Sequence, residues 1–165
     1  MVITVRRAAE SDFPHVKQVF CEANRFHAAL LPHRFQVVDP IITPDGLAAV
    51  LTDEDAALFV AETDHHVVGI VLLRLMRNPE DPILRPRRYI NVDDIAVLES
   101  YQGRGVGRRL MRRALEWAKR QGAQDIELSV SEANQRVIAL CERLGYERVA
   151  RRMRRRIDGA EWADK

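Results

Sequence analysis

A glycine-rich stretch at residues 102–107, Gln-Gly-Arg-Gly-Val-Gly, is the feature of this sequence that most restricts how the chain can fold. It follows an apolar, β-branched segment at 89–97 and precedes a segment at 106–121 whose apolar side chains recur at helical spacing. Glycines between a strand and a helix let the backbone approach a ligand closely, and the first N–H groups of the helix point at that ligand. The stretch therefore predicts a strand, a tight turn and a helix that together bind an anion.

Other glycine-rich phosphate loops fit this stretch less well. A Walker loop requires Lys and then Ser or Thr after its last glycine, whereas Arg108 and Arg109 stand there. The dinucleotide fingerprint places glycines at its first, third and sixth positions, and here they take the first, third and fifth. The acid of that fingerprint should end a strand, but Asp125 precedes one. A tight turn without a ligand is the remaining alternative.

The chain is predicted to form one domain over residues 1–165, because its length is typical of a single domain and 47% of its residues are apolar. This composition excludes a disordered or collagen-like chain. Strands are predicted at 2–6, 57–61, 67–76, 89–97 and 126–130, with a final pair in 146–157. Helices are predicted from 11–14 towards 31, and at 46–51, 106–121 and 135–144. This order is typical of an α/β (α+β) domain around a mixed sheet.

Charge is distributed unevenly along the sequence. Residues 1–103 carry 10 basic and 15 acidic side chains, a net charge of −5, whereas residues 104–165 carry 16 and 9, a net charge of +7. Arginine supplies 23 of the 26 basic residues, which reflects either coding bias or phosphate contacts, since the guanidinium group suits phosphate. We expect the second half of the chain to present the anion site.

Cysteines and the N-terminal residues argue against several classes of protein. Cys21 and Cys141 form neither a disulfide framework nor a metal motif, and no group of residues has metal-ligand spacing, so no metal is predicted. The charged N-terminal stretch is typical of neither a signal peptide nor a membrane anchor. We therefore expect a cytoplasmic protein with no membrane partner.

Two motifs resemble those of the GNAT N-acetyltransferase superfamily. Gln102, Gly105 and Gly107, preceded by Ile-Ala-Val at 95–97, resemble its motif A. Residues 127–146 resemble its motif B, with the matching residues Asn134, Ala139, Leu140, Leu144, Gly145 and Tyr146. The two motifs have the expected spacing, and the resemblance covers residues 2–157. It implies a GNAT fold, in which a mixed central β-sheet with splayed parallel strands is flanked by helices.

The same resemblance implies an enzyme that transfers an acetyl group from acetyl-CoA directly to a primary amine of a small molecule or a peptide. The co-substrate would lie between the strands at 89–97 and 126–130, and Asn134 would hydrogen-bond its pantetheine arm. The pantetheine would also pair with the strand edge formed by Ile95, Ala96 and Val97. The pyrophosphate would rest on the backbone of Gln102, Gly103, Arg104, Gly105, Val106, Gly107 and Arg108.

Two aspartates are candidates for the catalytic base, because a protonated amine must lose a proton before it attacks a thioester. Strand alternation places Asp93 on the face of Ile95 and Val97, and Asp94 on the opposite face. Family members with small polyamine or aminoglycoside-like acceptors carry an acid at the position of Asp93. Asp93 is therefore the favoured base and Asp94 the alternative. Either aspartate could instead have a purely structural role, as the partner of a nearby arginine.

Two other positions bear on the chemistry. Ribosomal-protein acetyltransferases of the family carry a Glu where this chain has Ser129, which argues against that branch; Glu127 could substitute as a base. Many members carry a Tyr that protonates the leaving thiolate where this chain has Cys141. Cys141 could donate that proton, another group or water could, or the thiolate could leave unprotonated; we favour a packing role for Cys141.

Other functions and assemblies remain open for this chain. A GNAT domain could keep the acyl-CoA site without catalysing transfer. The arginine-rich segment 148–157 could bind nucleic acid, although it lacks interleaved aromatic residues and alternates as a strand with a solvated arginine face would. The sequence leaves open whether the chain forms a homodimer.

Overall fold

A mixed sheet of five strands, in the order β1-β2-β3-β4-β5, organises the residues that the structure describes, 2–157 of a computed structural model. The strands are β1 (Thr4–Arg7), β2 (Ala56–Thr63), β3 (His66–Arg77), β4 (Arg88–Val97) and β5 (Asp125–Glu127). Neighbours from β1 to β4 are antiparallel, and β4 and β5 are parallel. The mixed sheet expected from the sequence is thus confirmed.

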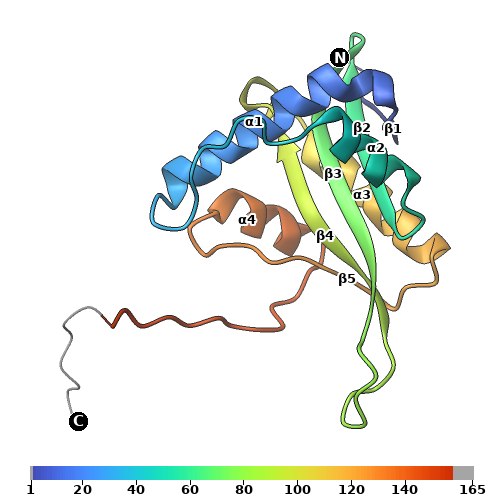
Figure 1. Ribbon diagram of the computed structural model, residues 1–165, viewed down its shortest axis with the longest axis vertical. Helices are drawn as coiled ribbons and strands as arrows, with labels where there is room; N and C mark the ends of the chain where they lie inside the picture. The colour runs from blue at the N-terminus through green and yellow to red at the C-terminus, as the bar shows by residue number, and fades with distance from the viewer. Residues whose placement is uncertain (1, 158–165) are drawn as a thin grey trace.

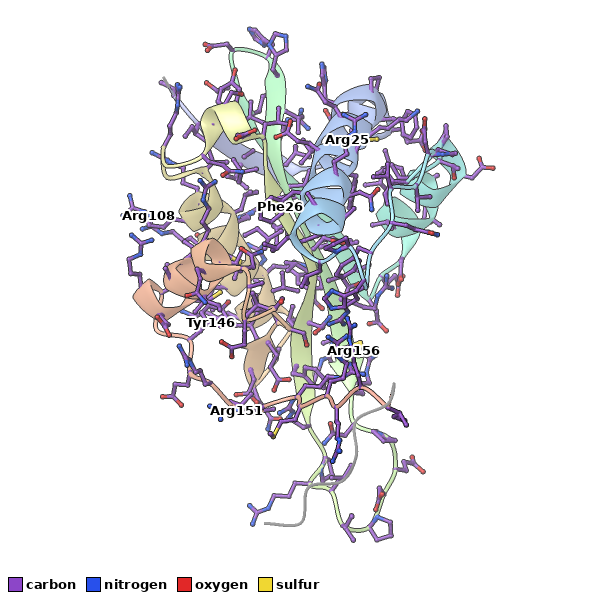
Figure 2. The ribbon with its side chains drawn as sticks, turned by 90° about the vertical axis from the view of Figure 1, so that its left-hand side faces the viewer. Arg25, Phe26, Arg108, Tyr146, Arg151 and Arg156 are labelled. Atoms are coloured by element: carbon purple, nitrogen blue, oxygen red, sulfur yellow. The ribbon has the colours of Figure 1, made fainter. Side chains whose placement is uncertain are left out.

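Helices cover both faces of this sheet (Figures 1 and 2). On one face lie α1 (Phe13–Leu30) and α2 (Pro44–Thr52); on the other lies α3 (Val106–Arg120), with α4 (Gln135–Arg143) beside its beginning. Short 3-10 turns, η1 (Glu10–Asp12) and η2 (Glu99–Tyr101), precede α1 and follow β4. A Cβ at Gly69 of β3 would lie 3.1 Å from Val106 and 3.2 Å from Leu110, both in α3. Gly69 therefore points to the face of the sheet that α3 covers.

The core lies between the central strands and these helices. β2 and most of β3 are buried because both of their faces are covered, which explains their continuous apolar sequences. α3 buries the stripe predicted from its spacing, namely Val106, Leu110, Ala114, Trp117 and Ala118, together with Met111. Each fully buried aliphatic side chain contributes roughly 1.5–3 kcal/mol relative to an exposed one.

One arginine ties β1 to the start of α1. Arg6 donates from Nη1 to Asp12 Oδ2 at 2.7 Å and from Nε to Glu62 Oε2 at 2.7 Å on β2. The Asp12 carboxylate also accepts from the Ala9 N–H at 2.8 Å. Asp12 occupies the N-cap position of α1, but its carboxylate makes no capping hydrogen bond there and instead binds Arg6 and the Ala9 N–H.

The end of the chain differs from its prediction. β5 has three residues rather than the predicted five, and no strand follows α4 within the described residues. The pair of strands predicted in 146–157 is therefore wrong for this structure. Residues 147–157 leave the body of the molecule as an exposed, extended segment (Figure 1). A strand requires a hydrogen-bonded neighbour, and this segment has none in the described part of the chain.

Candidate functional site

A β-bulge in β4 sets the positions of the two candidate carboxylates. Val92 pairs with Leu73 of β3, and Leu72, the preceding residue of β3, pairs with Asp94. Asp93 is therefore the extra residue of the bulge. Bulges are common beside active sites, where they redirect side chains.

This bulge corrects the predicted orientation of Asp93. Residues paired across two strands share a face of the sheet, so Asp94 lies on the face of Leu72, away from α3. Ile95 and Val97 face α3, because Val97 pairs with Gly69. The prediction that Asp93 shares a face with Ile95 and Val97 is wrong, because the extra residue interrupts the alternation between Val92 and Asp94. The prediction that Asp94 lies on the opposite face from Ile95 and Val97 is confirmed.

Asp93 takes part in a polar network on the face covered by α1 and α2. Its carboxylate accepts from Arg74 Nε at 3.1 Å and from Asn91 Nδ2 at 2.6 Å. Arg74 also donates from Nη1 to Asp53 at the end of α2, at 3.1 Å. Asp93 thus pairs with an arginine, as expected if its role is structural rather than catalytic.

Asp94 has a different environment. Its side chain is half-buried on β4, and burial, followed by the negative charge of Asp93, raises its pKa from 3.8 to about 6. A carboxyl group with a pKa near the working pH is suited to accept a proton from a substrate. Of the two aspartates, Asp94 therefore has the more suitable environment for a base.

The parallel strands β4 and β5 separate after only three residue pairs. The last pair joins Asn91 to Glu127, and the chain then crosses away from β4 to reach α4 (Figure 1). The rest of β4 keeps its ladder with β3 but has no strand on the β5 side within residues 2–157. Ile95, Ala96 and Val97 lie half-buried along this open edge, which leads into the glycine turn.

The glycine turn exposes its backbone at the start of α3. Gly103 and Gly105 have φ angles of 74° and 83°, values that glycine adopts without strain. A Cβ at Gly103 would meet no heavy atom within 4 Å, and one at Gly105 would meet only the Arg108 guanidinium, at 3.9 Å. Arg108 points outward from the first turn of α3 (Figure 2). Open backbone, a helix N-terminus and a nearby arginine together suit an anion.

Gly107 and Gln102 hold this turn in place. A Cβ at Gly107 would lie 3.2 Å from Leu140 of α4, so Gly107 permits close packing of α3 and α4 rather than opening the turn. Gln102 donates from Nε2 to the Val97 carbonyl at 3.0 Å and accepts from Arg136 through Oε1. The Gln of the motif therefore joins the end of β4, the turn and α4, a role that its sequence position alone did not reveal.

Asn134 and Arg104 complete the surroundings of the opening. Asn134 is buried, and its Oδ1 caps α4 by accepting from the Val137 N–H at 3.3 Å. Its amide nitrogen carries two further N–H donors. The Arg104 guanidinium lies 5.6 Å from the centre of the Tyr101 ring, which holds this arginine beside the turn.

Comparison with protein families identifies the arrangement. A model of the acetyltransferase (GNAT) family matches residues 17–146, which include both motifs and the opening between β4 and β5. The chain belongs to the GNAT family. Its sheet and flanking helices form the GNAT fold that the sequence motifs implied.

Relatives of this GNAT chain include N-acetyltransferases of two archaea. The sequence is 34% identical over 97 residues to the N-acetyltransferase MJ1207 of Methanocaldococcus jannaschii, a match covering 58% of this chain and 40% of that protein. It is 33% identical over 104 residues to an N-alpha-acetyltransferase of Sulfurisphaera tokodaii, covering 60% of this chain and 61% of that protein. The chain thus matches about 40–60% of the length of these relatives.

Solved structures share the GNAT fold over nearly the whole chain. The BH1408 protein of Bacillus halodurans, solved in a mutant form, has a TM-score of 0.88 at 22% identity and covers 95% of this chain and 99% of its own. The aminoglycoside acetyltransferase AAC(6')-Iy, in complex with a bisubstrate analogue of CoA and acetylneamine, has a TM-score of 0.72 at 20% identity. That match covers 94% of this chain and 98% of its own.

Cys141 and Tyr146 lie together at the end of α4 in this GNAT chain. Cys141 is 7% exposed, and burial raises the pKa of its thiol. The Tyr146 N–H donates to the Cys141 carbonyl at 3.0 Å, across the turn at Gly145. Burial also raises the pKa of Tyr146 to about 12, and its hydroxyl is buried without a partner among the described residues. In the sequence, Tyr146 stood out only as a motif residue; its buried hydroxyl became apparent from the structure.

Two further side chains, the alternative base Glu127 and His27, have partners of their own. Glu127 accepts from Arg87 Nη2 at 2.6 Å, so this alternative base is held in an ion pair. The centre of the His27 ring of α1 lies 5.7 Å from that of Phe26 and 5.5 Å from that of Phe35, and burial lowers the pKa of His27.

Residues 2–157 contain neither a membrane-spanning helix nor a metal-binding cluster. Among the helices of this part of the chain, none is long and apolar enough to cross a membrane. The same residues contain no group of three or more His, Cys, Asp or Glu side chains that could hold a metal ion.

Proposed function

We propose that this chain is an N-acetyltransferase that uses acetyl-CoA to acetylate a primary amine. The observation that carries the proposal is the opening between β4 and β5, whose free β4 edge leads directly into a glycine turn with exposed backbone. An extended thiol arm with a pyrophosphate at one end matches this combination of strand edge and anion site. The non-catalytic acyl-CoA-binding domain remains the alternative.

The fit to acetyl-CoA rests on the glycine turn and its arginines. Gly103 and Gly105 leave space where any side chain would project, so the phosphates could approach the first N–H groups of α3. Arg104 and Arg108 would neutralise their charge. Ile95 to Val97 would pair with the amides of the pantetheine arm, and the Asn134 amide would donate to the same arm.

Asp94 is our proposed base. Acetyl-CoA, when bound, supplies an acetyl thioester whose carbonyl carbon becomes bonded to the amine nitrogen as the sulfur leaves. The amine must first lose a proton, and the Asp94 carboxylate, with its pKa raised to about 6, would accept it. Asp93, held by Arg74 and Asn91, would keep a second negative charge beside Asp94 and so help to raise that pKa.

The acceptor is proposed only at the level of a primary amine. One relative is named an N-alpha-acetyltransferase, and one structural neighbour was solved with an acetylneamine analogue. These names support two acceptor types, a peptide N-terminus and an aminoglycoside-like amine. Thiol release from acetyl-CoA, measured with both types of amine, separates them. If acetyl-CoA binds but neither type of amine causes thiol release, the non-catalytic alternative is favoured.

The anion site can be tested with two glycines of similar backbone conformation. Gly105 has φ 83° and Gly122, at the far end of α3, has φ 64°, so replacement of either by alanine strains the backbone. At about one hundred times its dissociation constant, acetyl-CoA should stabilise the wild type by ~2.7 kcal/mol. Gly105→Ala should lose most of this stabilisation, whereas Gly122→Ala should keep it. Equal stabilisation of both variants, measured by thermal unfolding, would remove the anion-site argument.

A further inference from the structure

A hollow of about 200 Å³ lies between β1 and α3, and we call it the β1–α3 hollow. Side chains of two segments line it: Ile3 and Val5 at β1, and Arg109, Arg112, Arg113 and Glu116 of α3. Guanidinium groups therefore supply most of its polar lining. Because the guanidinium group is planar and carries several N–H donors, it suits phosphate and carboxylate groups. The β1–α3 hollow thus has the composition of an anion site.

Helical spacing brings the three arginines together. Arg112 and Arg113 follow Arg109 by three and four residues, so the three side chains are neighbours on adjacent turns of α3. Like charges at this spacing repel one another and destabilise a helix. Among residues 2–157, neither Arg109 nor Arg112 has a side-chain hydrogen bond or an ion pair that would relieve this repulsion. An anion held between them would do so.

Arg113 is held in position by the fold itself. Its Nη1 donates to Glu116 Oε2 at 3.0 Å, and its guanidinium carbon lies 5.1 Å from the centre of the Phe59 ring. The side chain is nevertheless 33% exposed, so it is not shut away from solvent. A side chain that is already fixed loses little conformational freedom when a ligand binds. Arg113 is therefore a preorganised part of the β1–α3 hollow.

The charge and the size of the β1–α3 hollow favour one kind of anion. Its three arginines and one glutamate carry three positive charges and one negative charge, a net charge of +2. A phosphate monoester has a charge near −2 at neutral pH and three strong acceptor oxygens, whereas a carboxylate has one charge and two oxygens. The hollow has room for roughly six water-sized groups, which is enough for a phosphate group. A phosphate dianion matches both properties.

We propose that the β1–α3 hollow binds the phosphate group of a small phosphate monoester. Arg109, Arg112 and Arg113 would each donate to the phosphate oxygens, and such charge-assisted hydrogen bonds are stronger than neutral ones. Ile3 and Val5 would contact the carbon that carries the ester oxygen. The ligand would join β1 to α3 and stabilise the folded chain by binding to it.

This site is separate from the one proposed for acetyl-CoA. β1 and β5 are the two outer strands of the sheet, so the β1–α3 hollow and the opening between β4 and β5 lie towards opposite edges. Arg112 and Arg113 also follow Gly105 by seven and eight residues, which places them ~10–12 Å along the helix from the glycine turn. The proposal therefore does not depend on acetyl transfer.

Calorimetric titration of the full chain with inorganic phosphate, in the presence of saturating CoA, tests the proposal. CoA is included because the glycine turn could itself bind phosphate; if CoA does not bind, the Gly105→Ala variant serves the same purpose. We expect the wild type to bind phosphate under these conditions. Ethyl phosphate should bind at least as tightly, and acetate at least about tenfold more weakly.

Matched variants locate the bound phosphate. Arg109→Gln and Arg112→Gln should each weaken phosphate binding at least about tenfold, because each removes a charge-assisted hydrogen bond. Arg120→Gln is the control: it is the same substitution on the same helix, at a residue that does not line the β1–α3 hollow. It should bind phosphate as the wild type does. Thermal unfolding without ligand verifies that all three variants are folded.

Four results would overturn the proposal. Phosphate binding that CoA abolishes would place the phosphate at the glycine turn. Equal binding by the Arg112→Gln and Arg120→Gln variants would place it elsewhere on the surface. Acetate binding as tight as that of phosphate would show that the hollow does not select a dianion. Inorganic phosphate that binds more tightly than ethyl phosphate would make free phosphate the ligand. A lack of thiol release with amines would contradict the proposed enzymatic activity and leave these outcomes unchanged.

Discussion

At the scale of single residues, the extra residue in β4 has the largest chemical consequence. It brings Asp93 and Asp94 onto the same face, where Arg74 binds the first and burial acts on the second. Two neighbouring carboxyl groups thus have different environments, and such pairs often divide the acid, base and positioning roles of an active site.

Asp94→Asn should change stability in a pH-dependent way. The raised pKa means that the wild type carries a buried charge above about pH 6, whereas below about pH 4 the group is protonated in both folded and unfolded states. The stability that the protonated form provides is therefore lost as the pH rises through about 6. A shift from 3.8 to about 6 corresponds to roughly 3 kcal/mol. The free energy of unfolding of the variant, relative to wild type, should rise by up to that amount between pH 4 and pH 8.

The same variant tests the role of Asp94 in catalysis. If Asp94 is the base, Asp94→Asn should lower kcat about 10²- to 10⁴-fold at pH 7, with acetyl-CoA affinity unchanged. Asp93→Asn is the matched control and should retain at least about a tenth of the activity. The opposite order of effects would assign the base to Asp93 instead.

Cys141→Ala should retain most of the turnover. The thiol is buried, and its raised pKa keeps it protonated, which is consistent with an apolar packing role. The lost sulfur should cost about 1 kcal/mol of stability through the small cavity that it leaves. Steady-state kinetics and thermal unfolding measure both effects. A large fall in kcat with unchanged acetyl-CoA affinity would make Cys141 the proton donor.

At the scale of elements, the connection between β1 and α1 depends on one ion-pair cluster. Arg6 bridges Asp12 before the helix and Glu62 on β2, so three segments of the chain share one guanidinium group. Hydrogen bonding from Arg6, above all, lowers the pKa of Asp12, and Asp12 is only 6% exposed. This cluster should matter more than the exposed ion pairs of the helices.

Asp12→Ala should therefore destabilise the protein by ~2 kcal/mol, because it leaves Arg6 and the Ala9 N–H with fewer partners. Glu116→Ala, which breaks the pair with Arg113 on the surface of α3, is the control and should cost less than ~0.5 kcal/mol. Because the folded-state pKa of Asp12 is lowered, its contribution is present above pH ~4 and is lost as the pH falls further. Urea unfolding at pH 7 and pH 3 measures both; equal losses for the two variants would contradict the expectation.

At the scale of the whole molecule, the uneven charge along the sequence corresponds to a region of the fold that is rich in arginine. The second half begins at the glycine turn and supplies Arg104, Arg108 and Arg136 around the opening between β4 and β5. A polyanion that approaches this opening meets a concentrated positive charge, and salt weakens such attraction.

Acetyl-CoA binding should weaken several-fold as the salt concentration rises from about 0.05 to 0.5 M. Arg108→Ala should weaken binding and reduce this salt dependence, because its guanidinium lies beside Gly105. Arg120→Ala is the matched control: it lies on the same helix ~18 Å further along and should leave the salt dependence unchanged. Calorimetric titration at several salt concentrations measures both. A binding constant independent of salt would contradict the role of these arginines.

The sequence by itself determined the elements whose cause is local. The helical spacing of α3, the glycines that require positive φ at 103 and 105, and the apolar hairpin of β2 and β3 all follow from neighbouring residues. These were predicted to within a few residues. The two motifs were sufficient to predict the GNAT fold and the location of its opening.

Only the tertiary structure decided the features that depend on pairing between distant segments. The bulge at Asp93 exists because β4 has one residue more than β3 can pair, so an alternation rule applied to β4 alone placed Asp94 correctly but could not place Asp93. β5 ends at Glu127 because its parallel partner diverges there. Residues 146–157 have the alternation of strands, but a strand needs hydrogen bonds from a neighbour, and whether a neighbour exists is a property of the assembled sheet.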